Sequence, residues 1–123
     1  MRYILAIYND ENGPQGEMDE WFEYDQAIRQ SGIVEAGEAL QSVSTATTVR
    51  VRNGERLLTD GPFAETKEQL GGFYLVNCKD LDEAISWAER MPSTPHGSVE
   101  VRPIMEFEGA GAEGEGAAEQ TAS

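Results

Sequence analysis

The order in which strand-like and helix-like segments alternate constrains this chain more than any other feature of its sequence. Two β-prone runs, 47–51 and 55–59, flank Asn53-Gly54 near the middle of the chain. Asn-Gly between such runs is the strongest short-range signal for a β-hairpin. Other short, mostly apolar or alternating runs predict strands over 3–8, 33–40, 72–76 and 98–104. Gly37, inside the second of these, predicts a bulge or a close approach of the backbone.

Two segments repeat apolar residues at helical spacing. The first, 17–31, has an acidic first turn and ends before Gly32, which supplies a plausible C-terminal stop. The second begins at Asp80, a cap residue with Glu83 three positions on, and stops before Pro92. The apolar residues that define these helices are Met18, Trp21, Phe22 and Ile28 in the first, and Leu81, Ala84, Ile85 and Ala88 in the second.

The resulting order is strand-helix-strand, hairpin, strand-helix-strand. This order predicts an α+β fold, a ferredoxin-like split βαβ unit with a β-hairpin inserted in its middle. In such a fold an antiparallel sheet carries both helices on one face, so its other face needs cover. A second copy of the same chain is the simplest cover, and the sequence therefore predicts a homodimer.

The chain of 123 residues divides into a body and a tail. Residues 1–107 have the size of a single domain with one core. Residues 108–123 read EGAGAEGEGAAEQTAS and contain no aromatic or branched apolar side chain. Packing cannot recover the entropy lost by ordering such a segment. We expect a disordered acidic tail whose removal leaves the fold intact.

Charge and hydropathy limit the classes of partner. The chain has 23 acidic and 9 basic residues, a net charge of -14. This charge repels phosphate backbones and anionic membranes, so neither nucleic acid nor a membrane is an expected partner. The longest mostly apolar run, 3–8, is far shorter than the roughly 20 residues of a membrane span, and no signal peptide is recognisable. We expect a cytoplasmic protein.

Motifs for common cofactors and metals are absent from the sequence. It has no phosphate-binding or dinucleotide glycine loop, no H-E-x-x-H, no paired Cys or His with metal spacing, and no serine nucleophile elbow. Cys78 is the single cysteine, and a lone cysteine at a strand end is most often a small buried apolar residue. No cofactor and no metal are expected.

One stretch resembles a known family signature. Residues 60–68 read DGPFAETKE and residues 71–74 read GGFY, with the spacing of the DGPF-type branch of the YCII-related family. Further matches are AGEAL over 36–40, EAI over 83–85, WA over 87–88 and GSVEVRP over 97–103. The resemblance implies a dimeric α+β barrel of ferredoxin-like subunits, in a family with few assigned reactions. Some relatives outside this branch are thought to use a His and Asp pair for dehydrochlorination or related ring chemistry, with the His on the first helix. The first helix here has no histidine, which argues against that mechanism.

Two residues are candidates for acid-base catalysis. His96 lies in the loop P-S-T-P-H-G and could act as a general base on an aromatic or ketone substrate. Asp60 could orient it across a cleft. The alternative is that His96 is an ordinary surface residue, because sequence fixes no partner carboxylate and a fold alone does not imply a function.

The loop at 60–68 supplies candidate ligand-binding residues. Phe63, Glu65, Lys67 and Glu68 could line a pocket mouth, where a lysine beside carboxylates could bind or protonate a polar substrate. The alternative is turn chemistry, since Asp, Gly and Pro each favour tight turns, with Phe63 filling the core.

Three further charged residues are candidates for a cleft. Glu100 and Arg102 share the polar face of the last strand, and Glu38 is an acid in an otherwise apolar strand. Each could face a cleft or a subunit interface, and a buried acid with a raised pKa would be a candidate base. The alternative is a solvated edge with exposed ion pairs that contribute little to stability.

Three functions fit these features. The first is a homodimeric small-molecule-binding domain whose cleft is bounded by the 60–68 loop and the last strand. The second is a metal-independent lyase or isomerase that acts on a small cyclic or ketone compound through His96 or a cleft carboxylate. The third is a protein-interaction role in transcriptional regulation, because relatives of this branch are often linked with extracytoplasmic-function sigma factors.

Overall fold

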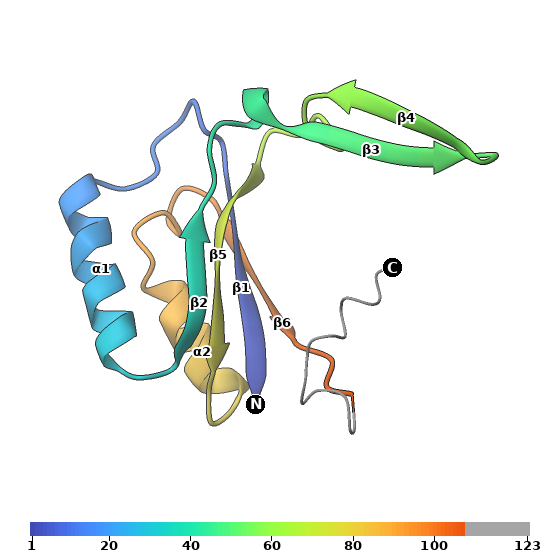
Figure 1. Cartoon of the computed structure of the whole chain (residues 1–123). Coiled ribbons are helices and arrows are strands. Elements are labelled where there is room, and N and C mark those ends of the chain that lie inside the picture. The colour runs from blue at the N-terminus through green and yellow to red at the C-terminus, as the bar shows by residue number, and fades with distance from the viewer. Residues whose placement is uncertain (108–123) are drawn as a thin grey trace.

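Residues 1–107 form a four-stranded antiparallel sheet, two α-helices and a separate hairpin (Figure 1). The computed structural model describes residues 1–107, so the tail predicted at 108–123 lies outside the described residues. The sheet has the strand order β2-β5-β1-β6, which confirms the predicted α+β ferredoxin-like fold. The elements in chain order are β1 (Arg2–Asn9), α1 (Met18–Gln30), β2 (Val34–Ala39), the short 3-10 helix η1 (Val43–Thr45), β3 (Thr47–Arg52), β4 (Glu55–Asp60), β5 (Gln69–Asn77), α2 (Leu81–Glu89) and β6 (Ser98–Pro103).

Strand β1 lies in the middle of the sheet because its apolar residues serve both faces. Leu5 pairs with Tyr74 of β5 and with Val101 of β6, and all three belong to the helix-covered core. The next residue, Ala6, pairs with Phe73 and points to the opposite face. Side-chain alternation along β1 therefore separates a core face from a face that no helix within residues 1–107 covers.

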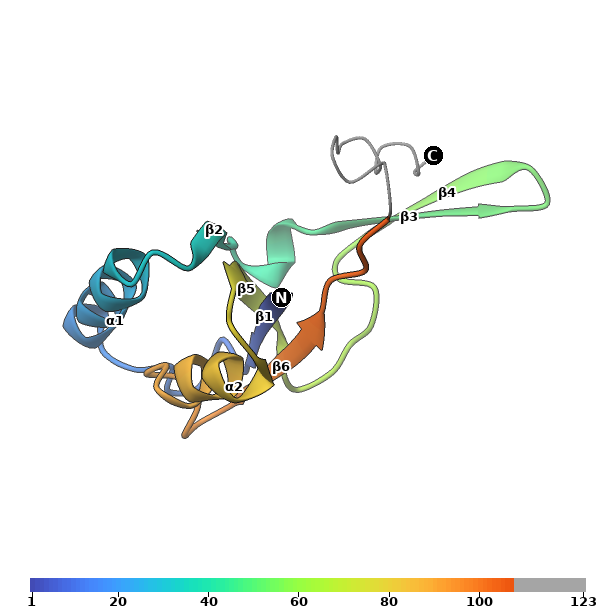
Figure 2. The ribbon, with the colours of Figure 1, turned by 90° about the horizontal axis from the view of Figure 1, so that it is seen from below.

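Both helices pack on the same face of the sheet (Figure 2). In α1 the Glu17 backbone N–H donates to the Glu20 side chain at 2.9 Å, and Gly32 follows the helix with φ +86°. In α2 the Asp80 side chain accepts from the Glu83 backbone N–H at 2.9 Å. The predicted helix ends are confirmed. Cys78 is buried, as predicted from its position.

The apolar face predicted for α1 is only partly the buried one. Tyr24 and Ile28 are the buried residues of this helix, whereas Met18 and Phe22 are each 68% exposed. Trp21, also in the first turns, packs against the core, so Met18 and Phe22 lie on a different side of α1 from the residues that contact the core. Within residues 1–107, neither helix has the length or the apolar character that a membrane-spanning segment requires.

The predicted hairpin is confirmed and stands away from the sheet (Figure 1). Asn53 and Gly54 at its tip have φ of 53° and 78°, the left-handed conformation that a two-residue hairpin turn requires. The prediction for Gly37 is also confirmed. A Cβ placed there would lie 2.7 Å from a ring carbon of Tyr74, and the register of β2 shifts between Val34 and Ala36.

An aromatic cluster connects the two helices to the sheet. The ring of Tyr24 meets Trp21, Tyr74 and Trp87 edge to face at 5.7, 5.9 and 6.0 Å between centroids. The Tyr24 hydroxyl donates to the Trp87 carbonyl at 2.7 Å, and the Tyr74 hydroxyl donates to Asp25 at 2.6 Å. Burial raises the pKa of both phenols above the usual range.

These phenols predict a loss of stability at alkaline pH. A phenol whose pKa is raised on folding stabilises the fold fully below its pKa in the unfolded chain, about 10, and this contribution is lost as the pH rises toward the folded pKa. We expect the free energy of unfolding, measured in urea, to fall as the pH rises above about 9. A Tyr24→Phe, Tyr74→Phe variant should show a shallower fall, and equal slopes in the two proteins would contradict this assignment.

Candidate functional site

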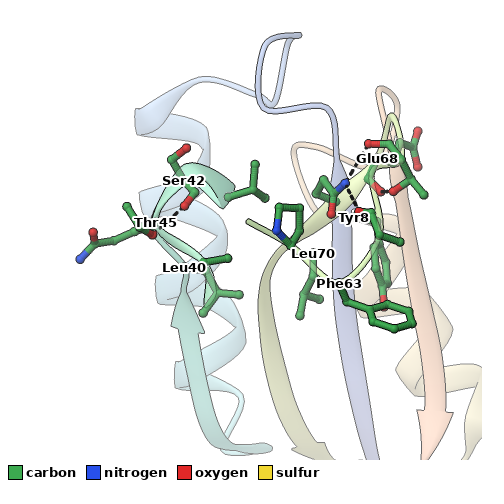
Figure 3. Close-up of a pocket in the computed structure, with 14 residues that line it drawn as sticks. Tyr8, Leu40, Ser42, Thr45, Phe63, Glu68 and Leu70 are labelled. Carbon is green, nitrogen blue, oxygen red and sulfur yellow. Dashed lines mark hydrogen bonds between the residues drawn. The ribbon is translucent and has the colours of Figure 1, made fainter. Parts of the chain in front are cut away.

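A pocket lies between the loop that follows β4 and the segment that connects β2 to β3. Its volume is about 620 Å³, within the range of small-molecule sites. Figure 3 shows Leu40, Ser42 and Thr45 on one side of it and Tyr8, Phe63 and Glu68 on the other. The remaining lining residues are Gln41, Val43, Ala46, Pro62, Ala64, Thr66, Gln69 and Leu70. We call this space the loop pocket.

Hydrogen bonds within the chain hold the loop in place. Gly61 turns the chain with φ +103°, and its N–H donates to the Ala46 carbonyl at 2.8 Å. Further on, the Gln69 side chain donates to the carbonyls of Ala64 and Thr66 at 2.8 and 2.9 Å. The loop is therefore organised without a ligand, which lowers the entropy cost of binding one.

The opposite wall is fixed in the same way. Glu11 accepts from the Ser42 hydroxyl at 2.7 Å and from the Val43 backbone N–H at 3.1 Å. The Leu40 N–H donates to the Gly71 carbonyl at 2.9 Å. Because these polar groups already have partners, the apolar side chains dominate what a ligand would contact.

The character of the pocket comes from two aromatic rings and one carboxylate. Tyr8 and Phe63 supply the rings, and the Arg50 guanidinium lies over the Phe63 ring at 5.5 Å from its centroid. Glu68 accepts from the Ser98 hydroxyl at 2.9 Å and is half-buried. A carboxylate at the edge of an apolar wall can accept hydrogen bonds from a ligand N–H or O–H.

The interpretation that Phe63 fills the core is wrong. This side chain is 76% exposed, and it does not belong to the helix-covered core. The 60–68 loop thus brings Phe63 and Glu68 to the pocket wall. Glu65 and Lys67 are exposed in the same loop and do not line the pocket.

His96 and Asp60, the two candidates for acid-base catalysis, form no hydrogen bond or ion pair with each other. His96 is exposed in the turn after α2, where its backbone N–H donates to the Ser93 carbonyl at 2.9 Å. Asp60 is exposed at the end of β4. Throughout residues 1–107, no hydrogen bond or ion pair involves the side chain of either residue. A catalytic role for this pair stays a prediction.

The other predicted charges lie on the two edge strands. Arg102 donates from Nε to Glu100 at 2.8 Å within β6, and Glu38 is exposed in β2. Neither acid is an isolated buried carboxylate, and neither lines the loop pocket. In the part of the chain that the structure describes, no group of three or more His, Cys, Asp or Glu could hold a metal ion.

The sheet face opposite the helices is apolar at its centre. Ala6 on this face is only 6% exposed, and it pairs with Phe73 of β5 and Glu100 of β6. Its neighbours Ile4 and Leu75 pair with each other and are half-buried. We call this the open face, and Glu100 and Arg102 of β6, which pair with Ala6 and Ile4, lie at one of its edges.

Several residues of the loop pocket could not be named from sequence. Tyr8 and Leu70 come from paired strands, and Leu40 and Thr45 come from the connection before the hairpin. Only tertiary structure brings these segments together. The one available signal is the alternation along 3–8, which places Tyr8 on the face away from the helices.

Comparison with known proteins gives a consistent result. Residues 1–108 match the model of the YCII-related domain. An uncharacterized protein of Rhizobium meliloti (strain 1021) is 44% identical over 116 residues, which cover 85% of this chain and 92% of the relative.

Proposed function

This chain belongs to the YCII-related domain family, and we propose that it acts as a homodimeric small-molecule-binding domain. The observation that carries the proposal is the loop pocket, about 620 Å³ in volume, with walls fixed by internal hydrogen bonds. Pockets of this size with apolar walls and few polar groups are typical ligand sites. The motif at 60–68 further supports membership in the DGPF-type branch.

The walls favour an apolar ligand that is neutral or cationic. Tyr8 and Phe63 offer ring contacts, and among residues 1–107 Glu68 is the one charged residue that lines the pocket. An anionic ligand would meet this carboxylate and the strongly acidic chain around it. The ligand is therefore a ring compound or apolar amine with an N–H or O–H that reaches Glu68.

The open face supports the homodimer. Ile4, Ala6, Phe73 and Leu75 form a continuous apolar centre on a sheet face that no helix covers. An antiparallel sheet in a soluble dimer buries such a face against the same face of a second copy, which gives a self-complementary interface.

The surroundings of His96 and the open loop pocket favour small-molecule binding over an enzymatic or a protein-interaction role. A lyase or isomerase needs a base within reach of a second titratable group, and His96 is exposed without one in residues 1–107. A protein-interaction role is favoured by a filled cleft, whereas the loop pocket is open. Binding of a small molecule is thus the function with the strongest support.

A thermal-shift screen of a metabolite library tests the proposal. A ligand that binds only the folded chain raises the unfolding midpoint by mass action. Burial of a phenylalanine side chain is worth about 1.5 to 3 kcal/mol. Phe63→Ala should therefore raise the dissociation constant of a ligand that binds in the loop pocket by about 10- to 100-fold. Glu68→Gln should weaken ligands that donate to the carboxylate.

Glu65→Gln is the matched control, because Glu65 lies in the same loop and does not line the pocket. It should bind as the wild type does. Absence of any hit for the folded wild-type chain, or hits that Phe63→Ala retains at full affinity, would contradict the proposal.

A further inference from the structure

A second cavity lies between α1 and the sheet. Its volume is about 440 Å³, and its walls include Ile7, Trp21, Phe22, Leu40 and Tyr74. Residues from the first two turns of α1 form one wall, and Gly71 and Gly72 of β5, which have no side chains, belong to the sheet side of the cavity. We call this space the helix cavity. Leu40 is the one residue that also lines the loop pocket.

A buried amide without a partner lines the helix cavity. Asn9, at the end of β1, is 8% exposed. Two donors in the cavity wall bond elsewhere: Gln15 Nε2 donates to the Asp10 carbonyl at 3.3 Å, and Trp21 Nε1 donates to the Gln15 carbonyl at 2.8 Å. Across residues 1–107, the Asn9 side chain takes part in no hydrogen bond of its own, and buried polar groups rarely stay unpaired.

Local packing leaves this amide accessible from the cavity. A Cβ on Gly71 would lie 3.2 Å from Asn9 Oδ1, so the absence of a side chain at Gly71 keeps the amide uncrowded. The amide offers two N–H donors and one carbonyl acceptor. A ligand carbonyl, amide or hydroxyl would satisfy it.

The cavity walls are suited to an aromatic ring. Trp21 is fixed by its hydrogen bond to Gln15, and Phe22 and Met18 are large apolar side chains that line the cavity while remaining mostly exposed to solvent. A ring inserted between them would bury apolar surface on both sides. Exposed aromatic and methionine side chains at a cavity edge are typical of adaptable binding surfaces.

The charges around the cavity exclude an anion. Asp25 and Glu38 line it. Asp25 accepts from the Tyr74 hydroxyl at 2.6 Å and forms an ion pair with Arg29 at 3.0 Å. The Arg29 guanidinium is therefore already paired with a carboxylate and does not offer its charge to an anionic ligand. No lysine or arginine is among the lining residues.

We propose that the helix cavity is a second ligand site, which binds a neutral aromatic compound through a hydrogen bond between its carbonyl, amide or hydroxyl group and Asn9. This site is separate from the loop pocket, and it does not depend on the loop pocket having a ligand. The ring lies against Trp21 and Phe22, and its polar group reaches the end of β1.

Three ring compounds of similar size probe this site in the wild-type chain. Benzamide has the neutral ring and the amide, benzoate replaces the amide by an anion, and ethylbenzene has no hydrogen-bonding group. In ¹H-¹⁵N spectra, benzamide should cause saturable shifts of the Asn9 side-chain amide and the Trp21 indole N–H. Benzoate should bind at least 10-fold more weakly. Nuclear Overhauser contacts between benzamide and the Met18 methyl group should place the ring in the cavity without any variant.

An Asn9→Leu variant isolates the hydrogen bond. The affinity for benzamide should fall at least 10-fold, and the affinity for ethylbenzene should stay the same or rise. The unfolding midpoint of the variant should stay the same or rise, because an unpaired buried amide is removed. Phe63→Ala should leave benzamide binding unchanged, which separates this site from the loop pocket. The proposal is overturned if benzamide causes no saturable shift at Asn9, if its contacts fall on Phe63, or if folded Asn9→Leu binds it as tightly as the wild type.

Discussion

Replacing Tyr24 by alanine is expected to remove about 3 to 5 kcal/mol from the free energy of unfolding, as for other large aromatic side chains truncated in a core. Tyr24 is only 6% exposed and contacts both helices and the sheet through its three aromatic neighbours. Since domains of this size are stable by about 5 to 15 kcal/mol, this loss is a large part of the total. Urea unfolding followed by circular dichroism measures it.

Tyr24→Phe is the matched control for that variant. It keeps the ring contacts and loses only the hydrogen bond from the hydroxyl to the Trp87 carbonyl, which is worth about 1 kcal/mol. A similar loss in both variants would mean that the hydroxyl, rather than the ring packing, stabilises the cluster.

The second large effect is expected at the open face. Leu75 lies at its centre, paired with Ile4 of β1 and Ala36 of β2. In a dimer that buries this face, Leu75→Glu places carboxylates from the two copies close together without partners, and like charges in an interface cost several kcal/mol. We expect the dimer dissociation constant to rise at least about 100-fold, measured by sedimentation or light scattering.

Ser86→Glu is the control for added charge, because Ser86 is exposed on α2 away from the open face. This variant should remain dimeric. Leu75→Glu should still fold, since Leu75 is only half-buried in a single copy. A wild-type chain that is monomeric at all concentrations, or a Leu75→Glu chain that stays dimeric, would rule out the open face as the interface.

Most of the fold could be predicted because its signals are local. Asn53-Gly54 specifies the hairpin turn through positive φ angles, and Asp80 specifies the start of α2 through a single hydrogen bond to Glu83. Neither signal depends on distant residues. The buried face of α1 was harder to predict. Met18 and Phe22 are close to Trp21 in the helical repeat, but only Trp21, Tyr24 and Ile28 contact the core.

The candidate site could be predicted only where one segment supplies it. The motif at 60–68 indicates a turn near a pocket, and two of the residues predicted from it, Phe63 and Glu68, line the loop pocket. Their role in binding stays a prediction. Turn chemistry does not say which way Phe63 points, so its burial was predicted wrongly. Asn9 gave no signal at all, because an asparagine at a strand end is usual before a turn, and its lack of a partner depends on Gln15 and Trp21.

The hairpin gives this chain two levels of cooperativity. Its strands bond to each other, and at the base of the hairpin the Gly61 N–H donates to the Ala46 carbonyl and the Thr48 hydroxyl donates to the Gly61 carbonyl. Val49, Val51 and Leu58 remain largely exposed along it. An isolated two-stranded ribbon is marginally stable in water, so in a single copy the hairpin can open while the four-stranded sheet stays intact. The amides of β3 and β4 then exchange with solvent through this local opening, and those of β1 exchange only through unfolding of the whole domain.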